Sequence, residues 1–155
     1  MSRAFVKESD GDDGSGDLPD RPISPHPNLV TPAGLAMIDA ELARLGPEMA
    51  AAQAASDRTA QARITRDRRY WTVRRATAEV IAPPAGQSEV RFGSTVTIAR
   101  DDGRTLTYRI VGEDEADPPK GTLSYVSPLA RALLGKVVGD VVRAGTGEAE
   151  IIAIA

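Results

Sequence analysis

The sequence predicts an α+β protein in which an antiparallel helical hairpin, a short coiled coil, precedes a small C-terminal β/α domain. Apolar residues between positions 35 and 52 recur at alternating spacings of three and four, which is typical of helices that pack on one another. After residue 88, segments rich in valine, isoleucine and threonine alternate with glycine-containing turns, which is typical of short strands. We therefore expect a tail over residues 1–29, a hairpin over 30–82 and a β/α domain over 88–155.

The tail combines charge, glycine and proline with few apolar side chains. Residues 1–20 carry six acidic and two basic residues, a net charge of −4, whereas the whole chain carries −3. The Pro-rich stretch that follows contains His26, the only histidine. Because so little apolar surface is available to bury, we expect a disordered acidic tail followed by an extended strap.

The first helix begins at Thr31-Pro32, since threonine is a favoured N-cap and proline is favoured at the first helical position. Gly46-Pro47 lies within the predicted helix, where proline should kink or break it. The apolar seam keeps its spacing across this point. It is formed by Leu35, Ile38, Leu42, Leu45, Met49 and Ala52.

The second helix is expected from Arg58 to Val80, after a turn at residues 55–57. Its seam places Ile64, Trp71 and Ala78 seven residues apart, and the charged Asp67 and Arg74 weaken it at intermediate positions. Between positions 58 and 75 there are seven arginines and one acid, a net charge of +6. This is either a solvated helix face or a surface for a polyanion. Non-specific nucleic-acid contact would involve Arg63, Arg66, Arg68 and Arg69.

The C-terminal part is predicted to form a compact module of short strands with one small helix. Two strands over 90–99 and 104–112 flank a hairpin turn, a third follows at 122–126, and a last hairpin covers 141–144 and 149–154. The short helix from Leu129 to Leu134 follows the cap Ser127-Pro128. The acidic residues Glu113, Asp114, Glu115 and Asp117 fit a solvated turn better than a cation site, because their spacing matches no metal-binding loop.

Composition argues against several classes of site. The absence of cysteine excludes disulfides, thiolate nucleophiles and cysteine-ligated zinc, and one histidine argues against a histidine-based metal site. We therefore expect no metal site and no resident cofactor. No apolar run approaches the ~18 residues of a membrane span, and the acidic N-terminus is unlike a signal peptide. By elimination, we expect a cytoplasmic protein without membrane contact.

Three segments of the C-terminal half carry a resemblance to a known family: IVGEDEAD (110–117), SPLARALLGK (127–136) and VGDVV (138–142). They resemble the C-terminal domain of the transcript-cleavage factors GreA and GreB. The resemblance implies an FKBP-like fold, bacterial RNA polymerase as the partner, and docking at the rim of the polymerase secondary channel. It also implies that Ser127, Pro128, Leu129 and Arg131 bind the partner. The same residues fit an ordinary helix N-terminus, and Val126 stands where the family usually has Asp or Asn.

The hairpin resembles the same family more loosely, through VTPAG (30–34), GPEM (46–49), SDRTAQ (56–61) and RDRRYW (66–71). In the family, an aspartate and a glutamate three residues apart at the hairpin tip hold the magnesium ion that activates water for RNA cleavage. Asp57 matches the aspartate, but Ala60 occupies the position of the glutamate. Each arm is also shorter by about two helical turns, or ~12 Å at 1.5 Å per residue. The resemblance therefore implies that Asp57 is a vestigial catalytic residue that would meet Mg²⁺ only through the polymerase. Alternatively, Asp57 is simply the N-cap of the second helix.

Three functions follow as hypotheses. The leading one is a polymerase-binding elongation regulator without strong cleavage stimulation, which is not itself an enzyme. The second is a cleavage factor that assists backtracked polymerase through Asp57 and Mg²⁺. The third, prolyl isomerisation, rests on the implied fold alone. It is disfavoured because Phe92, Tyr108 and Tyr125 are the only aromatic residues available to line an apolar pocket in this domain.

Overall fold

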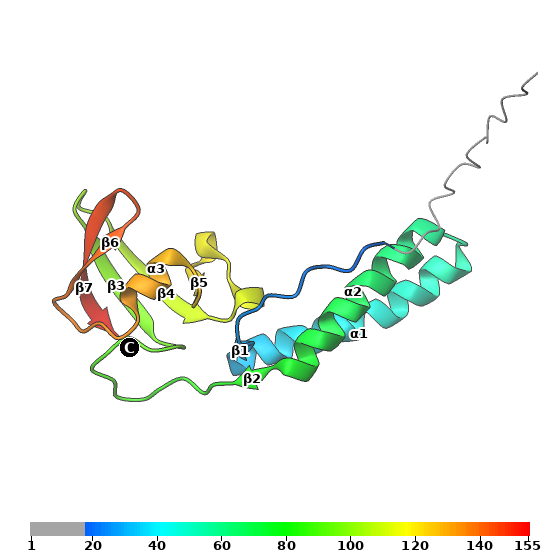
Figure 1. Cartoon of the computed structure of the whole chain (residues 1–155), viewed down its shortest axis with the longest axis horizontal. Helices are drawn as coiled ribbons and strands as arrows, with labels where there is room; N and C mark the ends of the chain where they lie inside the picture. The colour runs from blue at the N-terminus through cyan, green and yellow to red at the C-terminus, as the bar shows by residue number, and fades with distance from the viewer. Residues whose placement is uncertain (1–17) are drawn as a thin grey trace, which may run out of the picture. The chain divides into compact units, whose positions relative to one another are not determined.

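A computed structural model describes residues 18–155 of the chain (Figure 1). These residues form two compact units, one of residues 18–23 and 40–73 and the other of residues 24–39 and 74–155. Most of the predicted acidic tail, residues 1–17, lies outside the described part. The predicted fold class, a helical hairpin followed by a small β domain with one helix, is confirmed. Within residues 18–155, no helix combines the length and apolar character that a membrane span needs.

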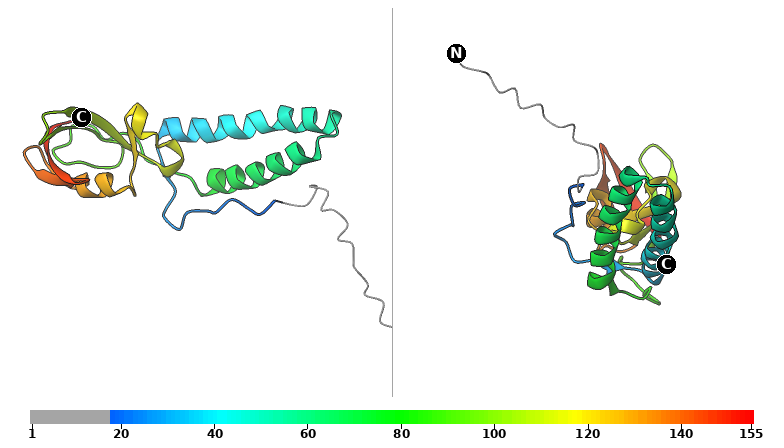
Figure 2. Two further views of the ribbon diagram at one scale, coloured as in Figure 1. Left: turned by 90° about the horizontal axis from the view of Figure 1, so that it is seen from above. Right: turned by 90° about the vertical axis from the view of Figure 1, so that its right-hand side faces the viewer.

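The hairpin consists of α1 (Pro32–Ala54) and α2 (Arg58–Thr77), which run antiparallel on either side of a tight turn (Figure 2). In the first unit, Leu45, Ala52 and Ile64 are buried between the helices. Met49, Ala60 and Trp71 pack against them. The predicted helix-packing seam is therefore confirmed, because its members alternate between buried and half-buried positions.

The sequence predicted a kink or a break at Gly46-Pro47, and the break does not occur, since α1 continues through both residues. Their exposure explains how the helix tolerates them: the proline ring faces solvent and does not disturb the buried seam. Proline inside a helix costs about 3 kcal/mol relative to alanine. The 23-residue helix offsets this cost through the apolar side chains that it buries on the opposite face.

The second helix ends at Thr77 rather than at Val80, so Ala78 lies outside it. The chain then forms β2 (Glu79–Val80), which pairs in parallel with β1 (Leu29–Val30). The backbone amide of Glu79 donates to the Asn28 carbonyl over 2.9 Å. Two-residue strands are too short for an alternating pattern, and for this reason the pair leaves no signal in the sequence.

The C-terminal domain contains a five-stranded sheet with the strand order β5-β4-β3-β7-β6. The strands are β3 (Thr95–Arg100), β4 (Thr105–Val111), β5 (Thr122–Ser124), β6 (Val141–Ala144) and β7 (Gly147–Ile154). Both predicted hairpins are confirmed, and within this five-stranded sheet only β4 and β5 are parallel neighbours. The first strand begins later than predicted because Gly93 adopts a turn conformation with φ of 87°.

The short helix α3 (Pro128–Leu133) covers the core of this sheet. Its buried residues Ala130 and Leu133 belong to the same apolar cluster as Val96, Ile110 and Ile151. Between β4 and β5, two single-turn 3₁₀ helices, η1 (Glu113–Glu115) and η2 (Pro118–Lys120), carry the acidic residues of the IVGEDEAD segment. The domain therefore presents two features for a functional site: the start of α3 and the acidic connection.

Candidate functional site

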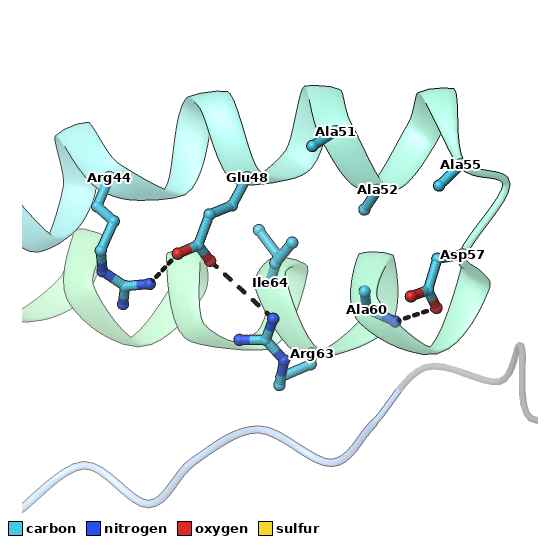
Figure 3. Close-up of a pocket in the computed structure, with 9 residues that line it drawn as sticks. All are labelled: Arg44, Glu48, Ala51, Ala52, Ala55, Asp57, Ala60, Arg63 and Ile64. Carbon is cyan, nitrogen blue, oxygen red and sulfur yellow. Dashed lines mark hydrogen bonds and ion pairs between the residues drawn. The ribbon is translucent and has the colours of Figure 1, made fainter.

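The hairpin tip holds an open groove of about 390 Å³ between the last turns of α1 and the first turns of α2 (Figure 3). Small side chains from both helices form its floor, and charged side chains surround it. The lining residues are Arg44, Glu48, Ala51, Ala52, Ala55, Asp57, Ala60, Arg63 and Ile64. The groove therefore brings Asp57 and Ala60, the two positions singled out in the sequence, to one place.

Asp57 caps the N-terminus of α2, as one of the two predictions for it stated. Its Oδ1 accepts a hydrogen bond of 3.0 Å from the backbone N–H of Ala60. The turn before it is tight, with Ser56 in the left-handed region at φ of 51° and the Asp57 amide donating to the Ala52 carbonyl over 2.9 Å. The carboxylate remains exposed at the tip. Capping therefore leaves Asp57 accessible to a partner.

The other charges of the groove are paired with one another. Glu48 hydrogen-bonds Arg44, and its second oxygen lies 4.0 Å from Arg63 (Figure 3). The hydrogen bonds that Arg44 donates to Glu41 and Glu48 raise the pKa of Arg44 above its ordinary value. No cluster of three or more acidic, histidine or cysteine residues suited to a metal ion occurs within residues 18–155. The groove thus offers one unshared carboxylate, Asp57, and too few ligands for a dedicated cation site.

Ala60 is half-buried and packs against the cluster formed by Leu45, Ala52 and Ile64. Its methyl group contributes to the apolar contact between the helices near the tip. A longer side chain at this position would begin at the groove and extend into it, since Ala60 lines the groove. The position that lacks a carboxylate is therefore sterically open toward Asp57.

The arginines of α2 differ in their partners. Arg63 and Arg66 lie 3.9 and 3.4 Å from the half-buried Asp67, and Arg69 donates to Asp20 over 2.6 Å. Arg68 is exposed and makes no ion pair within residues 18–155. The predicted nucleic-acid surface is therefore partly occupied by acids of the same chain.

The start of α3 has the predicted cap. Ser127 Oγ accepts a hydrogen bond from the Ala130 amide, and Pro128 occupies the first turn. Pro128 and Arg131 are exposed, whereas Leu129 is half-buried and packs against the domain core. Of the four predicted partner-binding residues, Pro128 and Arg131 are thus exposed, whereas Ser127 and Leu129 are half-buried.

The acidic connection is not the solvated turn that the sequence predicted. The Asp114 side chain is 8% exposed and accepts a 2.6 Å hydrogen bond from Arg74 Nε, and the Arg74 side chain is itself only 2% exposed. Arg74 Nη2 donates to the Asn28 side chain over 2.7 Å, and Asn28 donates back to the Arg74 carbonyl. Glu113 lies 3.9 Å from the same guanidinium. We call these four residues the Arg74 cluster.

Glu115 completes the acidic connection by binding the start of α1. Its carboxylate accepts hydrogen bonds from the Thr31 amide and hydroxyl and from the Gly112 amide. The Thr31 hydroxyl in turn accepts from the Gly34 amide over 3.0 Å, which confirms Thr31 as the helix cap. The acids between residues 113 and 115 therefore hold the chain together within their unit. In the sequence, Arg74 is a charged residue at a position of the apolar seam. Its burial there is explained only by Asp114 and Asn28, which lie far away along the chain.

Tyr125 lies near these residues. Its hydroxyl donates to the Pro27 carbonyl, and its ring meets Phe92 edge-on with centroids 5.7 Å apart. Burial, followed by the negative charge of Glu113, raises the pKa of Tyr125 above its ordinary value. These contacts attach the end of the strap to the β domain.

The chain thus combines a helical hairpin, with a capped and exposed aspartate at its tip, and a small sheet domain with a capped helix start. Comparison with known proteins shows which family the C-terminal part resembles. The model of the family described as "Transcription elongation factor, GreA/GreB, C-term" matches residues 85–155. Residues 85–155 are thus similar to the C-terminal domain of the GreA/GreB family.

Similar curated proteins carry names from the same family. Transcription elongation factor GreA of Alkalilimnicola ehrlichii is 51% identical over 78 residues, which cover 47% of this chain and 49% of that protein. GreB of Neisseria meningitidis is 42% identical over 87 residues, covering 55% and 53%. The chain thus spans about half the length of the curated relatives that it matches.

Solved structures are similar at lower identity. The crystal structure of GreA factor homolog 1 (Gfh1) of Thermus thermophilus is 21% identical, covering 84% of this chain and 99% of that one, with a TM-score of 0.41. A GreA/GreB factor from Nitrosomonas europaea is 18% identical, covering 82% and 98%, with a TM-score of 0.39.

Proposed function

We propose that this chain is a polymerase-binding regulator of transcription elongation that docks at the secondary channel of bacterial RNA polymerase and stimulates transcript cleavage weakly or not at all. The observation that carries the docking half of the proposal is the match of residues 85–155 to the GreA/GreB C-terminal domain. The chemistry of the tip supports the other half, since Asp57 has no second carboxylate at position 60.

Docking is assigned to the start of α3, where Pro128 and Arg131 are exposed beside the half-buried Leu129. An apolar group flanked by an arginine is a common centre for a protein interface. Arg131→Glu should therefore weaken binding to the polymerase core about tenfold. The matched control is Arg143→Glu on the exposed position of β6, which makes the same charge change elsewhere on the domain. Equal loss in both variants, measured by biolayer interferometry, would point to a general charge effect.

The proposal that cleavage stimulation is weak or absent rests on the number of magnesium ligands at the tip. A hard cation such as Mg²⁺ is usually held by one or two carboxylates together with waters and phosphates. Asp57 alone is half of the two-carboxylate pair that the resemblance implies, because Ala60 stands in place of the glutamate. We therefore expect no magnesium-dependent shortening of RNA that can be traced to Asp57.

The test is an RNA-length assay on halted, backtracked elongation complexes, with and without an authentic cleavage factor. We expect this protein alone to leave the RNA intact and to suppress the added factor in proportion to its concentration. RNA shortening by this protein, abolished in Asp57→Asn, would establish the alternative function as a cleavage factor. Absence of both effects would remove the docking proposal.

The alternative is supported by one specific observation, the exposure of the Asp57 carboxylate in an open groove (Figure 3). In that case the polymerase would supply the remaining magnesium ligands. Ala60→Glu should then increase cleavage strongly, because the added carboxylate would enter the same groove.

A further inference from the structure

The strap of residues 18–23 lies along α2 and is held there by charged contacts. Asp20 accepts a 2.6 Å hydrogen bond from Arg69, which also donates to the Leu18 carbonyl over 3.4 Å. The guanidinium of Arg21 stacks on the Tyr70 ring at 3.8 Å from its centroid and lies 3.5 Å from Asp67. Both surfaces belong to the same compact unit. The strap is therefore bound to the arginine-rich helix with a defined direction.

Followed toward the N-terminus, the strap runs toward the hairpin tip. Asn28 contacts Arg74 near the end of α2, whereas Asp20 contacts Arg69 further toward its start. Followed toward the N-terminus, the chain thus passes from the end of α2 toward its beginning. In Figure 3 the described part of the strap is the pale blue tube that runs beside the hairpin.

Arginines continue along the same face of α2 beyond Asp20. At 100° per residue, Arg58 lies about 20° and Arg66 about 60° from Arg69 around the helix axis. Arg66 Nε is buried without a hydrogen-bond partner among the described residues. Arg58 is exposed and makes no ion pair within residues 18–155. The arginine row is defined as Arg58, Arg66 and Arg69. Within residues 18–155, Arg69 pairs with Asp20 and Arg66 with its neighbour Asp67, whereas Arg58, toward the hairpin tip, has no acidic partner.

The sequence before the strap supplies the missing acids. Asp17, Asp13 and Asp12 precede Asp20. From Arg69 to Arg58 the helix rises about 16 Å, and an extended chain covers this distance in about five residues at ~3.3 Å each. Asp12 and Asp13 are therefore within reach of Arg58.

We propose that the acidic segment from Asp12 to Asp20 docks along the arginine row of α2 and competes there with other polyanions. The segment acts as an internal polyanion, because its carboxylates form the same charge-assisted hydrogen bonds to guanidinium groups that phosphates would form. The docking is a property of the chain alone and does not depend on polymerase binding. Since the pairs are solvent-exposed, salt weakens it.

The proposal is tested with two spin labels, and the natural absence of cysteine makes their placement simple. Ser15→Cys lies between the acids, and Thr59→Cys lies on the exposed start of α2. Pulsed electron paramagnetic resonance at low salt should give a short, narrow distance distribution. The distribution should broaden when Asp12, Asp13 and Asp17 are changed together to asparagine, or when Arg58 and Arg66 are changed to glutamine.

The matched control changes three exposed acids elsewhere to their amides, Glu79→Gln, Glu148→Gln and Glu150→Gln, and has the same net charge as the triple aspartate variant. It should keep the narrow distribution. A broad distribution in the parent protein, or equal broadening in the control, would overturn the proposal.

Competition gives a second measurement on the full chain without labels. A fluorescein-labelled oligouridylate should bind the triple aspartate variant about five- to tenfold more tightly than the parent or the control at low salt, because several exposed pairs no longer have to be displaced. The difference should shrink as salt rises. Equal affinities in all three proteins, or no binding to any of them, would show that the segment does not compete for this surface.

Discussion

At the scale of single residues, the Arg74 side chain ends in a closed set of partners: the Asp114 carboxylate, the Asn28 amide and the nearby Glu113. Removing one partner of a buried ion pair costs about 3–5 kcal/mol, because the other charge stays buried without compensation. We therefore predict that Arg74→Met lowers the free energy of unfolding by about 3 kcal/mol. Guanidinium denaturation followed by far-UV circular dichroism measures it.

The neighbouring residue provides the control for this prediction. Arg75 pairs with Asp39, but both side chains are about half exposed, at 47% and 53%. Exposed pairs contribute about 0–1 kcal/mol, and Arg75→Met should therefore stay within that range. If both variants lost the same amount, the Arg74 cluster would be solvated in solution.

Which residues could be predicted depends on the distance to their partners along the chain. The caps Thr31, Asp57 and Ser127 were predicted correctly, because each bonds a backbone amide three residues away. Arg74 was not, because its partners Asn28 and Asp114 lie 46 and 40 residues away. A local pattern shows that a charge interrupts the seam, but it cannot show what neutralises that charge.

At the scale of elements, α1 contains two glycines with opposite roles. Gly46 borders open space, with no atom within 4 Å of the place that an alanine methyl group would occupy, and its backbone is helical. Glycine in a helix interior costs about 0.5–1 kcal/mol relative to alanine. Gly46→Ala should therefore raise the free energy of unfolding by about that amount, as measured by thermal and chemical denaturation.

Gly34→Ala should do the reverse. A methyl group there would overlap the Glu115 carboxyl group, so the carboxylate would have to leave its position. The hydrogen bonds from Thr31 and Gly112 to Glu115 would then be lost. We expect a decrease of about 1–3 kcal/mol, the cost of leaving buried hydrogen-bonding groups unsatisfied. Stabilisation in both variants would contradict the role assigned to Glu115.

Helices and strands could be predicted where a long periodic pattern of apolar residues marks them. The prediction failed where contacts between distant segments outweigh a local residue preference. The seam of α1 and the strands of the two hairpins follow from spacing alone. The break expected at Pro47 did not occur, because helix packing on the buried side offsets the lost hydrogen bond. The β1–β2 pair joins residues about fifty positions apart through two residues each, and no window of sequence contains both.

At the scale of the whole molecule, the carboxylates at the tip and the length of the hairpin are two separate requirements for cleavage stimulation. Under the proposed function, cleavage stimulation needs a second carboxylate beside Asp57 and enough length to bring both to the polymerase active centre. The resemblance to the longer-fingered family implies that this hairpin is short by ~12 Å, or about two helical turns. Under the proposed function, we expect either deficit alone to prevent cleavage.

Length can be restored without disturbing the seam by inserting one heptad into each arm, after Met49 and before Ile64. Seven residues keep the heptad phase and add about 10 Å per arm. We predict that neither the insertion alone nor Ala60→Glu alone produces RNA shortening in backtracked complexes, whereas the combination does. Asp57→Asn added to the combination should abolish the effect. Shortening by Ala60→Glu alone would show that the native hairpin already reaches the active centre, and that the missing carboxylate is the whole deficit.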